Sequence, residues 1–357
     1  MSDKLSTPLC DLLGCKYPII QTAMGWVAGP ELVAATGNAG GFGFLAGATI
    51  PAQEMERDIK RIKELTEAPF GVNFHMYQPN AAEIVDFVVK HQVKAVSYSR
   101  SPGADLIKKL KQNNVVCMPT IGLPKHATKA IELGADAVTV QGGEGGGHTG
   151  SIPTSLLIPQ VVKAVDGRVP VAAAGGFQDG RGLIAALAWG ADGIAMGTRF
   201  FMSEESSPPP VTKQRYVDCQ DPAQIIVSKA LDGLPQRMIN NETLSKLENA
   251  GGLHKLYLAM VNGLKYRQFT GASFLQLFKS ALTMSKFGDI TLAQAMMSAN
   301  APMIIQKSMI DGLPHQGVLP SGQVAGVIDG LKTCEQIIQD VMTEANECLA
   351  ALAKLQQ

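Results

Sequence analysis

The chain has 357 residues, of which 46% are hydrophobic, and its 31 Lys and Arg are balanced by 31 Asp and Glu, so the formal net charge is zero. A chain this apolar and this weakly charged is neither disordered nor a coiled coil, and the neutral balance argues against a nucleic-acid-binding surface. Its length fits two domains of about 150 residues, or one barrel of about 250 residues with an appendage.

The cysteines and the first residues indicate which compartment to expect. The six cysteines are scattered with no Cys-x-x-Cys pair, so we expect reduced, mostly buried thiols. Met1–Leu5 carries charge and no apolar run, which favours a cytoplasmic location over secretion. Leu32–Gln53 is free of charge but holds five glycines and Pro51, so we expect a broken interior segment and no membrane helix.

Short β-branched or apolar runs, bounded by Gly or Pro, recur along the first 196 residues and predict strands. The eight candidates are Tyr17–Gln21, Gly43–Leu45, Phe70–Phe74, Ala95–Ser97, Val115–Pro119, Ala137–Gln141, Pro170–Ala173 and Gly193–Met196. Segments with helical periodicity lie between them, such as Gln53–Thr66, Asn80–His91, Pro124–Leu133 and Gly180–Trp189. This alternation predicts an α/β fold with a parallel sheet. Eight units favour a closed TIM-type (β/α)8 barrel over an open sheet of about five or six strands.

The alternation stops after Phe201, where three prolines follow at 208–210. Val211–Ile290 is predicted to be several helices and carries ten Lys and Arg against six Asp and Glu. This basic character favours an anionic substrate, although a solvated helical face also explains it. We expect residues 1–210 and 320–357 to form the barrel and 211–319 an inserted helical lid or substrate subdomain. The amphipathic stretch Gln323–Ala353 is predicted to supply the helix that follows the eighth strand.

Two glycine-rich loops follow the seventh and eighth predicted strands. They read Ala174-Gly175-Gly176-Phe177 and Gly197-Thr198-Arg199. In such barrels these two loops often hold a phosphate, and glycine lets backbone N–H groups approach the phosphate oxygens. The sequence therefore predicts a phosphate site there, with tight turns that only close the βα units as the alternative.

The sixth predicted strand ends in a longer glycine-rich loop, Gln141–Gly150, that contains one carboxylate and one imidazole. Gly145–Gly150 fits the pattern GxGxxG, but Ser151-Ile152-Pro153 follows where a helix should begin, so a dinucleotide site lacks its context. His148 is the best candidate for proton transfer, because histidine titrates near neutrality and this one follows a strand end. An ordinary hydrogen-bonded loop histidine is the alternative. The other histidines show no metal-ligand spacing, and we expect no metal site.

These segments resemble the nitronate monooxygenase (2-nitropropane dioxygenase) family of FMN-dependent barrel oxidoreductases. Pro18–Met24 resembles the family's first-strand flavin motif, Gly71–Asn73 its third-strand motif and Gln141–Gly150 its histidine motif. Ala173–Arg181 and Met196–Phe200 are similar to its phosphate loops. The resemblance covers nearly the whole predicted barrel.

The resemblance implies an FMN cofactor and a role for each matching residue. His148 would be the catalytic base that takes a proton from the substrate while the flavin accepts a hydride or an electron. The flavin ring would lie beside Thr22, Ala23 and Met24, with Asn73, Thr120, Gln141, Gly146 and Gly147 also near the flavin. Its phosphate would be held by Ala174, Gly175, Gly176, Gly197 and Thr198.

Departures from the family pattern point to a subtype. Many nitronate monooxygenases have proline and alanine where this chain has Ala23 and Gly145. Met24–Gly29, the three glycines before His148 and Ser321–Gly326 look more like a branch that dehydrogenates a hydroxylated ring acyl-CoA in steroid degradation. Lys255 and Arg267 of the basic segment would then meet the phosphates of CoA. Nitronate oxidation and NADH:quinone reduction are the alternatives that share every flavin residue.

Two further classes of function stay open from the residues alone. One is a flavin-free barrel lyase or isomerase that binds the substrate's own phosphate and moves a proton with His148 or Glu144. The other is a non-catalytic binding module, because a fold alone does not determine a function. In every case we expect a small-molecule partner, such as an acyl-CoA or a nitronate, and neither nucleic acid nor membrane. Self-association into a homo-oligomer is left open.

Overall fold

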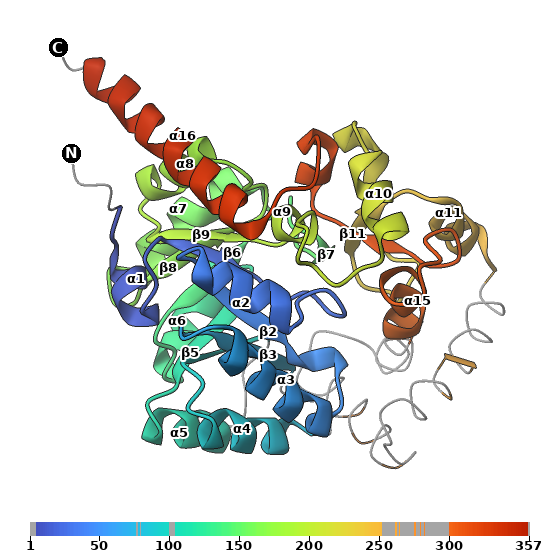
Figure 1. Ribbon diagram of the computed structural model, residues 1–357, viewed down its shortest axis with the longest axis horizontal. Coiled ribbons are helices and arrows are strands. Elements are labelled where there is room, and N and C mark those ends of the chain that lie inside the picture. Colours follow the sequence, from blue (N-terminus) through green and yellow to red (C-terminus); the bar gives the residue numbers. More distant parts are fainter. Residues whose placement is uncertain are drawn as a thin grey trace.

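Eight parallel strands close into a barrel in the computed structural model (Figure 1). In order around the barrel they are β1 (Ile19–Gln21), β2 (Phe42–Ala46), β3 (Gly71–His75), β4 (Ala95–Ser99), β5 (Val116–Ile121), β6 (Val138–Gln141), β8 (Val171–Ala174) and β9 (Gly193–Met196). Closure occurs at β1, where Ile20 lies opposite Phe42 of β2 and Ala195 of β9. The predicted TIM barrel is confirmed, and each predicted strand overlaps one of these eight.

The structure describes residues 5–75, 78, 80–99, 104–251, 261–262, 264, 275, 279, 282 and 300–355.

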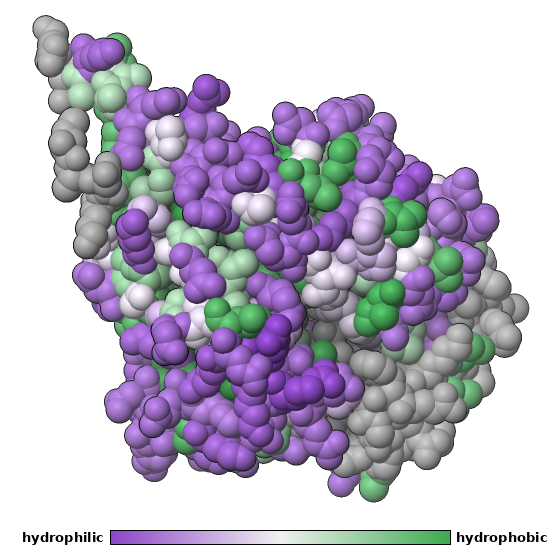
Figure 2. All heavy atoms as spheres, viewed as in Figure 1, coloured by the Kyte–Doolittle hydropathy of each residue, from purple (hydrophilic) through white to green (hydrophobic). Residues whose placement is uncertain are grey.

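Helices alternate with the strands and cover the outside of the barrel. After α1 (Pro8–Leu13) they are α2 (Pro30–Asn38), α3 (Ala52–Leu65), α4 (Ala81–Lys90), α5 (Ala104–Gln112), α6 (Pro124–Glu132), α7 (Thr154–Val165), α8 (Gly180–Ala188) and α9 (Thr198–Phe201), with the 3₁₀ turn η1 (Gly47–Thr49) after β2. Their apolar residues pack on the strands, and the surface over α3, α4 and α5 is hydrophilic (Figure 2). None of the helices in the described ranges combines the length and apolar character that crossing a membrane requires.

The two faces of each strand explain which side chains point into the barrel. In β3, Val72 and Phe74 are buried in one cluster with Ile59 of α3 and Ile84 of α4. Because side chains alternate along a strand, Asn73 and His75 face the barrel axis. The interior cluster itself contains small alanines from β4, β8 and β9 packed beside Phe42 and Phe44.

An inserted segment follows the eighth barrel strand and lies to one side of the barrel (Figure 1). Its described elements are α10 (Pro210–Val217), the 3₁₀ turn η2 (Pro222–Gln224), β10 (Ile225–Ser228), β11 (Gln236–Ile239), α11 (Glu242–Asn249) and α15 (Asn300–Met309). The expectation of helices alone was wrong, because β10 and β11 pair as an antiparallel hairpin. β11 also pairs with β7 (Gly147–His148) and β12 (Leu319–Pro320), which lie far away in the sequence. These pairings give the short strands the partners that a strand needs.

The chain then returns to the barrel through the 3₁₀ turn η3 (Gln323–Val327) and ends in α16 (Cys334–Lys354). α16 begins at a capping box formed by Thr333 and Gln336 and packs against α8 and α2, where a helix following the eighth strand is expected. Gly180 permits this contact, because a Cβ there would lie 2.2 Å from the backbone N of Ala345. The Gly180 N–H also donates to the Glu344 carboxylate over 3.0 Å.

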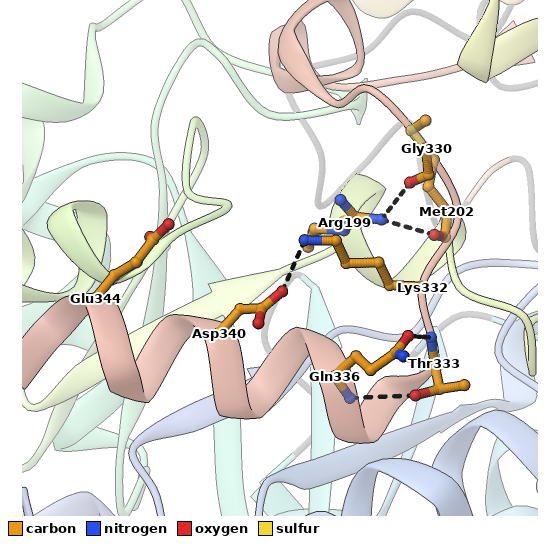
Figure 3. A network of polar contacts seen from close by, with 9 residues as sticks. Arg199, Met202, Gly330, Lys332, Thr333, Gln336, Asp340 and Glu344 are labelled. Atoms are coloured by element: carbon orange, nitrogen blue, oxygen red, sulfur yellow. Dashed lines mark hydrogen bonds and ion pairs between the residues drawn. The ribbon is translucent and has the colours of Figure 1, made fainter.

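Arg199 ties the returning segment to the barrel (Figure 3). Its Nη2 donates to the carbonyl oxygens of Met202, at 2.8 Å, and Gly330, at 2.9 Å. The side chain is buried, and burial lowers the pKa of Arg199 to about 10. Close by, the Lys332 ammonium pairs with the Asp340 carboxylate at 2.7 Å, but both of these side chains are about half exposed.

We expect Arg199→Ala to lower the free energy of unfolding by about 2–4 kcal/mol, because it leaves the buried Met202 carbonyl and the half-buried Gly330 carbonyl without their charged donor. Lys332→Ala is the matched control, since it removes a neighbouring but exposed cation worth under about 1 kcal/mol. Urea unfolding of both variants measures the difference. Equal midpoints for the two variants would contradict the assignment.

Candidate functional site

Polar side chains line the barrel at the carboxyl ends of β3 to β6. Asn73 donates through Nδ2 to Oγ of Ser97 over 2.9 Å, and Nδ1 of His75 lies 3.3 Å from Oγ of Ser99. Ser99 is opposite Thr120 in the register of β4 and β5, so these groups share one end of the barrel. Of these, Asn73 and Thr120 are predicted from the sequence, whereas His75, Ser97 and Ser99 are not, because only the strand register shows that they are neighbours.

The loop after β1 contacts the loop after β9. Thr22 donates through its backbone N–H to the Met196 carbonyl over 3.1 Å. A Cβ at Gly197 would lie 3.0 Å from Oγ1 of Thr22 and 3.6 Å from Sδ of Met24. Thr22, Ala23 and Met24, all half-buried, are thereby placed against the predicted phosphate loops.

The glycine loops after β8 and β9 present unbonded backbone donors. Gly175 and Gly176 follow Ala174 with φ of 99° and 84°, a left-handed conformation that favours glycine. Within the described ranges, the backbone N–H groups of Gly176, Gly197 and Thr198 donate no hydrogen bond, whereas the pairing of Ala174 with Ala195 directs the Gly175 N–H to the Ala195 carbonyl. Such N–H groups, with no Cβ in front of them, form the kind of cradle that binds phosphate. The geometry therefore fits the phosphate of a bound cofactor or substrate.

The returning segment closes one side of this cradle. The Gly322 N–H donates to Oγ1 of Thr198 over 2.9 Å, and a Cβ at Gly146 would lie 2.5 Å from the Gly322 nitrogen. The sequence analysis used Ser321–Gly326 only as a mark of a subtype. The structure adds Gly322 to the candidate site through contacts that cross more than 100 positions of sequence.

The histidine loop is fastened to the inserted segment. Gly147 and His148 form β7 and pair with Arg237 and Gln236 of β11. The Arg237 guanidinium donates twice to the Gly143 carbonyl, at 3.0 and 2.8 Å, and burial lowers the pKa of Arg237. Gln141 donates through Nε2 to the His148 carbonyl over 3.0 Å. The predicted residues Gln141, Gly146, Gly147 and His148 are thus held in one place.

The two titratable side chains of this loop have different surroundings. The Glu144 carboxylate accepts from the backbone N–H of Thr154 at 3.0 Å and from its hydroxyl at 2.6 Å, so it caps the start of α7. The His148 side chain is 56% exposed, with Nε2 lying 2.8 Å from Oδ2 of Asp232. Its Nδ1 has no partner among the residues that the structure describes. His148 therefore has a ring nitrogen available to a ligand, whereas Glu144 is engaged in the fold.

Asp232 is a site residue that the sequence analysis missed. It lies in the turn between β10 and β11, 84 positions from His148, and is 1% exposed. The sequence Asp232-Gly233 is typical of a turn, but nothing local indicates which side chain it meets.

In the described part of the chain, no group of three or more His, Cys, Asp or Glu side chains is placed to hold a metal ion. All six cysteines are unpaired. Lys255 and Arg267, the expected contacts of CoA phosphates, lie outside the described residues.

A model of the nitronate monooxygenase family matches residues 6–344, which is nearly the whole chain. A solved structure, FabK from Thermotoga maritima, superposes with a TM-score of 0.78 at 28% identity and covers 99% of this chain and 100% of its own.

Two relatives share one name, (3aS,4S,5R,7aS)-5-hydroxy-7a-methyl-1-oxo-octahydro-1H-indene-4-carboxyl-CoA dehydrogenase. The protein from Rhodococcus jostii is 46% identical over 98% of this chain and 99% of its own. The protein from Mycobacterium tuberculosis is 42% identical over 96% of each chain. Both alignments therefore include most of the inserted segment.

Proposed function

Because the chain belongs to the nitronate monooxygenase family, an oxidoreductase family whose membership implies a flavin, we propose that it is an FMN-dependent dehydrogenase of a hydroxylated ring carboxyl-CoA thioester. The observation that carries this proposal is the 46% identity to such a dehydrogenase over 98% of this chain and 99% of the relative. The alignment spans both the barrel and the insertion, whose strand β11 pairs with β7, the strand that contains His148.

The residues at the barrel mouth support FMN as the flavin. The phosphate would be held by the loops after β8 and β9, at Ala174, Gly175, Gly176, Gly197 and Thr198. Among these, Gly176, Gly197 and Thr198 have backbone N–H groups that donate no hydrogen bond within the described residues. The ring would lie beside Thr22, Ala23 and Met24, with Asn73, Thr120, Gln141, Gly146 and Gly147 around it. Small apolar side chains fill the barrel interior next to this site, since Ala172, Ala174 and Ala195 belong to the interior cluster.

In the proposed reaction His148 is the base. Its unbonded Nδ1 accepts the proton of the substrate hydroxyl as the carbinol C–H bond breaks, which turns the alcohol into a ketone. A bound FMN supplies the acceptor for the two electrons and the hydrogen of that C–H bond. Gln141 holds the His148 backbone through its carbonyl, and Asn73 offers a positioned amide at the same end of the barrel.

Gly145 supports the subtype. A Cβ at this position would lie 2.6 Å from Nε2 of Gln141. An alanine, as in many nitronate monooxygenases, would therefore make Gln141 shift, and Gln141 is the side chain that holds the His148 carbonyl. The glycine allows this arrangement of the histidine loop.

The division of the chain is part of the same proposal. Residues 1–210 and 320–357 would form the flavin-binding barrel, and 211–319 would form the subdomain that covers the substrate. The basic residues of 211–319 would meet the phosphates of CoA, which carry the negative charge that Lys and Arg bind.

The test is a visible absorbance spectrum of the purified protein, followed by anaerobic addition of substrates. We expect a yellow protein whose flavin absorbance is bleached by the hydroxylated ring carboxyl-CoA. The matched control is the same thioester without the ring hydroxyl, which should leave the colour unchanged. Bleaching by a nitronate or by NADH alone would overturn the proposed substrate, and a colourless protein that does not take up FMN would overturn the cofactor.

A further inference from the structure

The imidazole of His148 is supported on one edge by the inserted segment. Nε2 lies 2.8 Å from Oδ2 of Asp232, which sits in the hairpin turn between β10 and β11. Asp232 is 1% exposed while the His148 side chain is 56% exposed. The carboxylate is therefore buried behind the ring, and the opposite edge of the ring is open.

Two further hydrogen bonds set the orientation of the Asp232 carboxylate. Gln236, which is buried, donates through Nε2 to Oδ2 over 2.7 Å. The backbone N–H of Leu234 donates to Oδ1 over 3.0 Å. Oδ1 is thus held by the Leu234 N–H, and Oδ2 is held by Gln236 as well as by His148. The carboxylate therefore cannot rotate without losing hydrogen bonds.

The chemistry of the pair determines which ring nitrogen of His148 carries the proton. An ionised carboxylate only accepts hydrogen bonds, so Nε2 of His148 must be the donor. In the neutral imidazole the lone pair is then on Nδ1. This nitrogen has no partner among the described residues, and it is the atom required to accept a proton from a ligand.

We infer that Asp232 is the positioning residue of the catalytic base, an inference that rests on the function proposed above. Asp232 fixes the tautomer of His148, holds the ring in place and stabilises the charge that the ring gains on accepting a proton. Gln236 keeps Asp232 in this orientation. The inserted segment therefore completes the base itself, in addition to any role in covering the substrate.

Asp232→Asn tests the inference, because the Leu234 N–H determines how the new amide lies. The amide oxygen stays on that donor, because a backbone N–H cannot turn, whereas the Gln236 side-chain amide can turn over and present its oxygen to the new amide nitrogen. The amide nitrogen then faces Nε2 of His148 and donates to it. His148 must then carry its proton on Nδ1, where it blocks proton acceptance. We expect kcat to fall by at least about 10-fold and by up to about 10⁴-fold, the loss that the wrong histidine tautomer causes in a Ser-His-Asp triad, with KM and flavin content unchanged.

The tautomer is measured directly from the nitrogen chemical shifts of the His148 ring, without any substrate. We expect Nε2–H in the parent protein and Nδ1–H in Asp232→Asn. Asp221→Asn is the matched control, since Asp221 lies in the same inserted segment and, among the described residues, its carboxylate accepts from the Ala223 N–H alone; it should change neither the tautomer nor kcat.

An unchanged tautomer with kcat within about threefold of the parent would overturn the inference. If Asp232→Asn does not fold, Gln236→Met removes the Gln236 donor from Oδ2 and leaves His148 and Asp232 in place. We then expect a smaller fall in kcat of about 3- to 10-fold, which corresponds to one hydrogen bond of about 1 kcal/mol; no fall would again overturn the inference. Failure of the proposed function is distinguishable, because the parent protein would then not reduce its flavin with the hydroxylated ring carboxyl-CoA, whereas the tautomer measurement needs no substrate and still tests the pair.

Discussion

Replacement of His148 by asparagine is expected to lower the rate of flavin reduction by the true substrate by roughly 10²- to 10⁴-fold, the contribution of a general base. Asparagine has no group that accepts a proton near neutral pH, so the unbonded Nδ1 is lost. His148 pairs with Gln236 through its backbone, which the substitution leaves intact. The His148 imidazole is also no part of the glycine loops that would hold the phosphate. Flavin content should therefore be unchanged.

The measurement is single-turnover flavin reduction under anaerobic conditions, which separates the chemical step from reoxidation. His91→Asn is the matched control, because His91 pairs with Glu56 of α3 on the outside of the barrel, at 2.9 Å. It should react at the rate of the parent. A His148→Asn protein within a few fold of the parent would show that another group is the base.

The second large effect is expected at Gly176, where an added carboxylate should weaken binding of the cofactor phosphate. A Cβ at Gly176 would lie 3.5 Å from the nearest side-chain atom, Cβ of Glu144, so there is room for a side chain. Its φ of 84° is left-handed, a conformation that Asp and Asn tolerate better than other residues. Two unit charges about 5 Å apart at an effective dielectric constant of about 20 repel by about 3 kcal/mol, or about 10²-fold in affinity.

Gly176→Asn is the matched control, because it has the same shape and no charge. We expect Gly176→Asp to bind FMN about 10²-fold more weakly than Gly176→Asn, measured by flavin fluorescence on titration of the apoprotein. Urea unfolding of the two apoproteins separates this effect from repulsion between the new carboxylate and Glu144. Equal FMN affinities would show that no phosphate lies at this loop.

The barrel was predictable because its signals are local. Each predicted strand is a short apolar run bounded by Gly or Pro. The observed strands Val171–Ala174 and Gly193–Met196 coincide with two of these runs to within one residue. The alternation of strands with amphipathic helices leaves few ways to bury both sheet faces. The end of the barrel that carries the site followed from the same order, because the carboxyl ends of parallel strands meet at one edge.

The strands of the inserted segment could not be predicted from local sequence patterns. Ile225–Ser228 and Gln236–Ile239 are too short to be stable alone, and their strand conformation depends on pairing with Gly147–His148 and Leu319–Pro320. No sequence pattern within 211–319 indicates that these segments are the partners. The prediction of helices alone failed because tertiary pairing overrides local propensity.

The amino-acid sequence by itself determined the class of fold, the family and the residues expected around the flavin. These depend on periodicity and on motifs whose members are close together in the chain. Tertiary structure alone decided that Asp232 lies behind His148, that Gly322 closes the phosphate loops and that α16 packs on Gly180. These contacts join positions 84, 124 and 165 residues apart, and such distant partners are selected only by the packing of the whole chain.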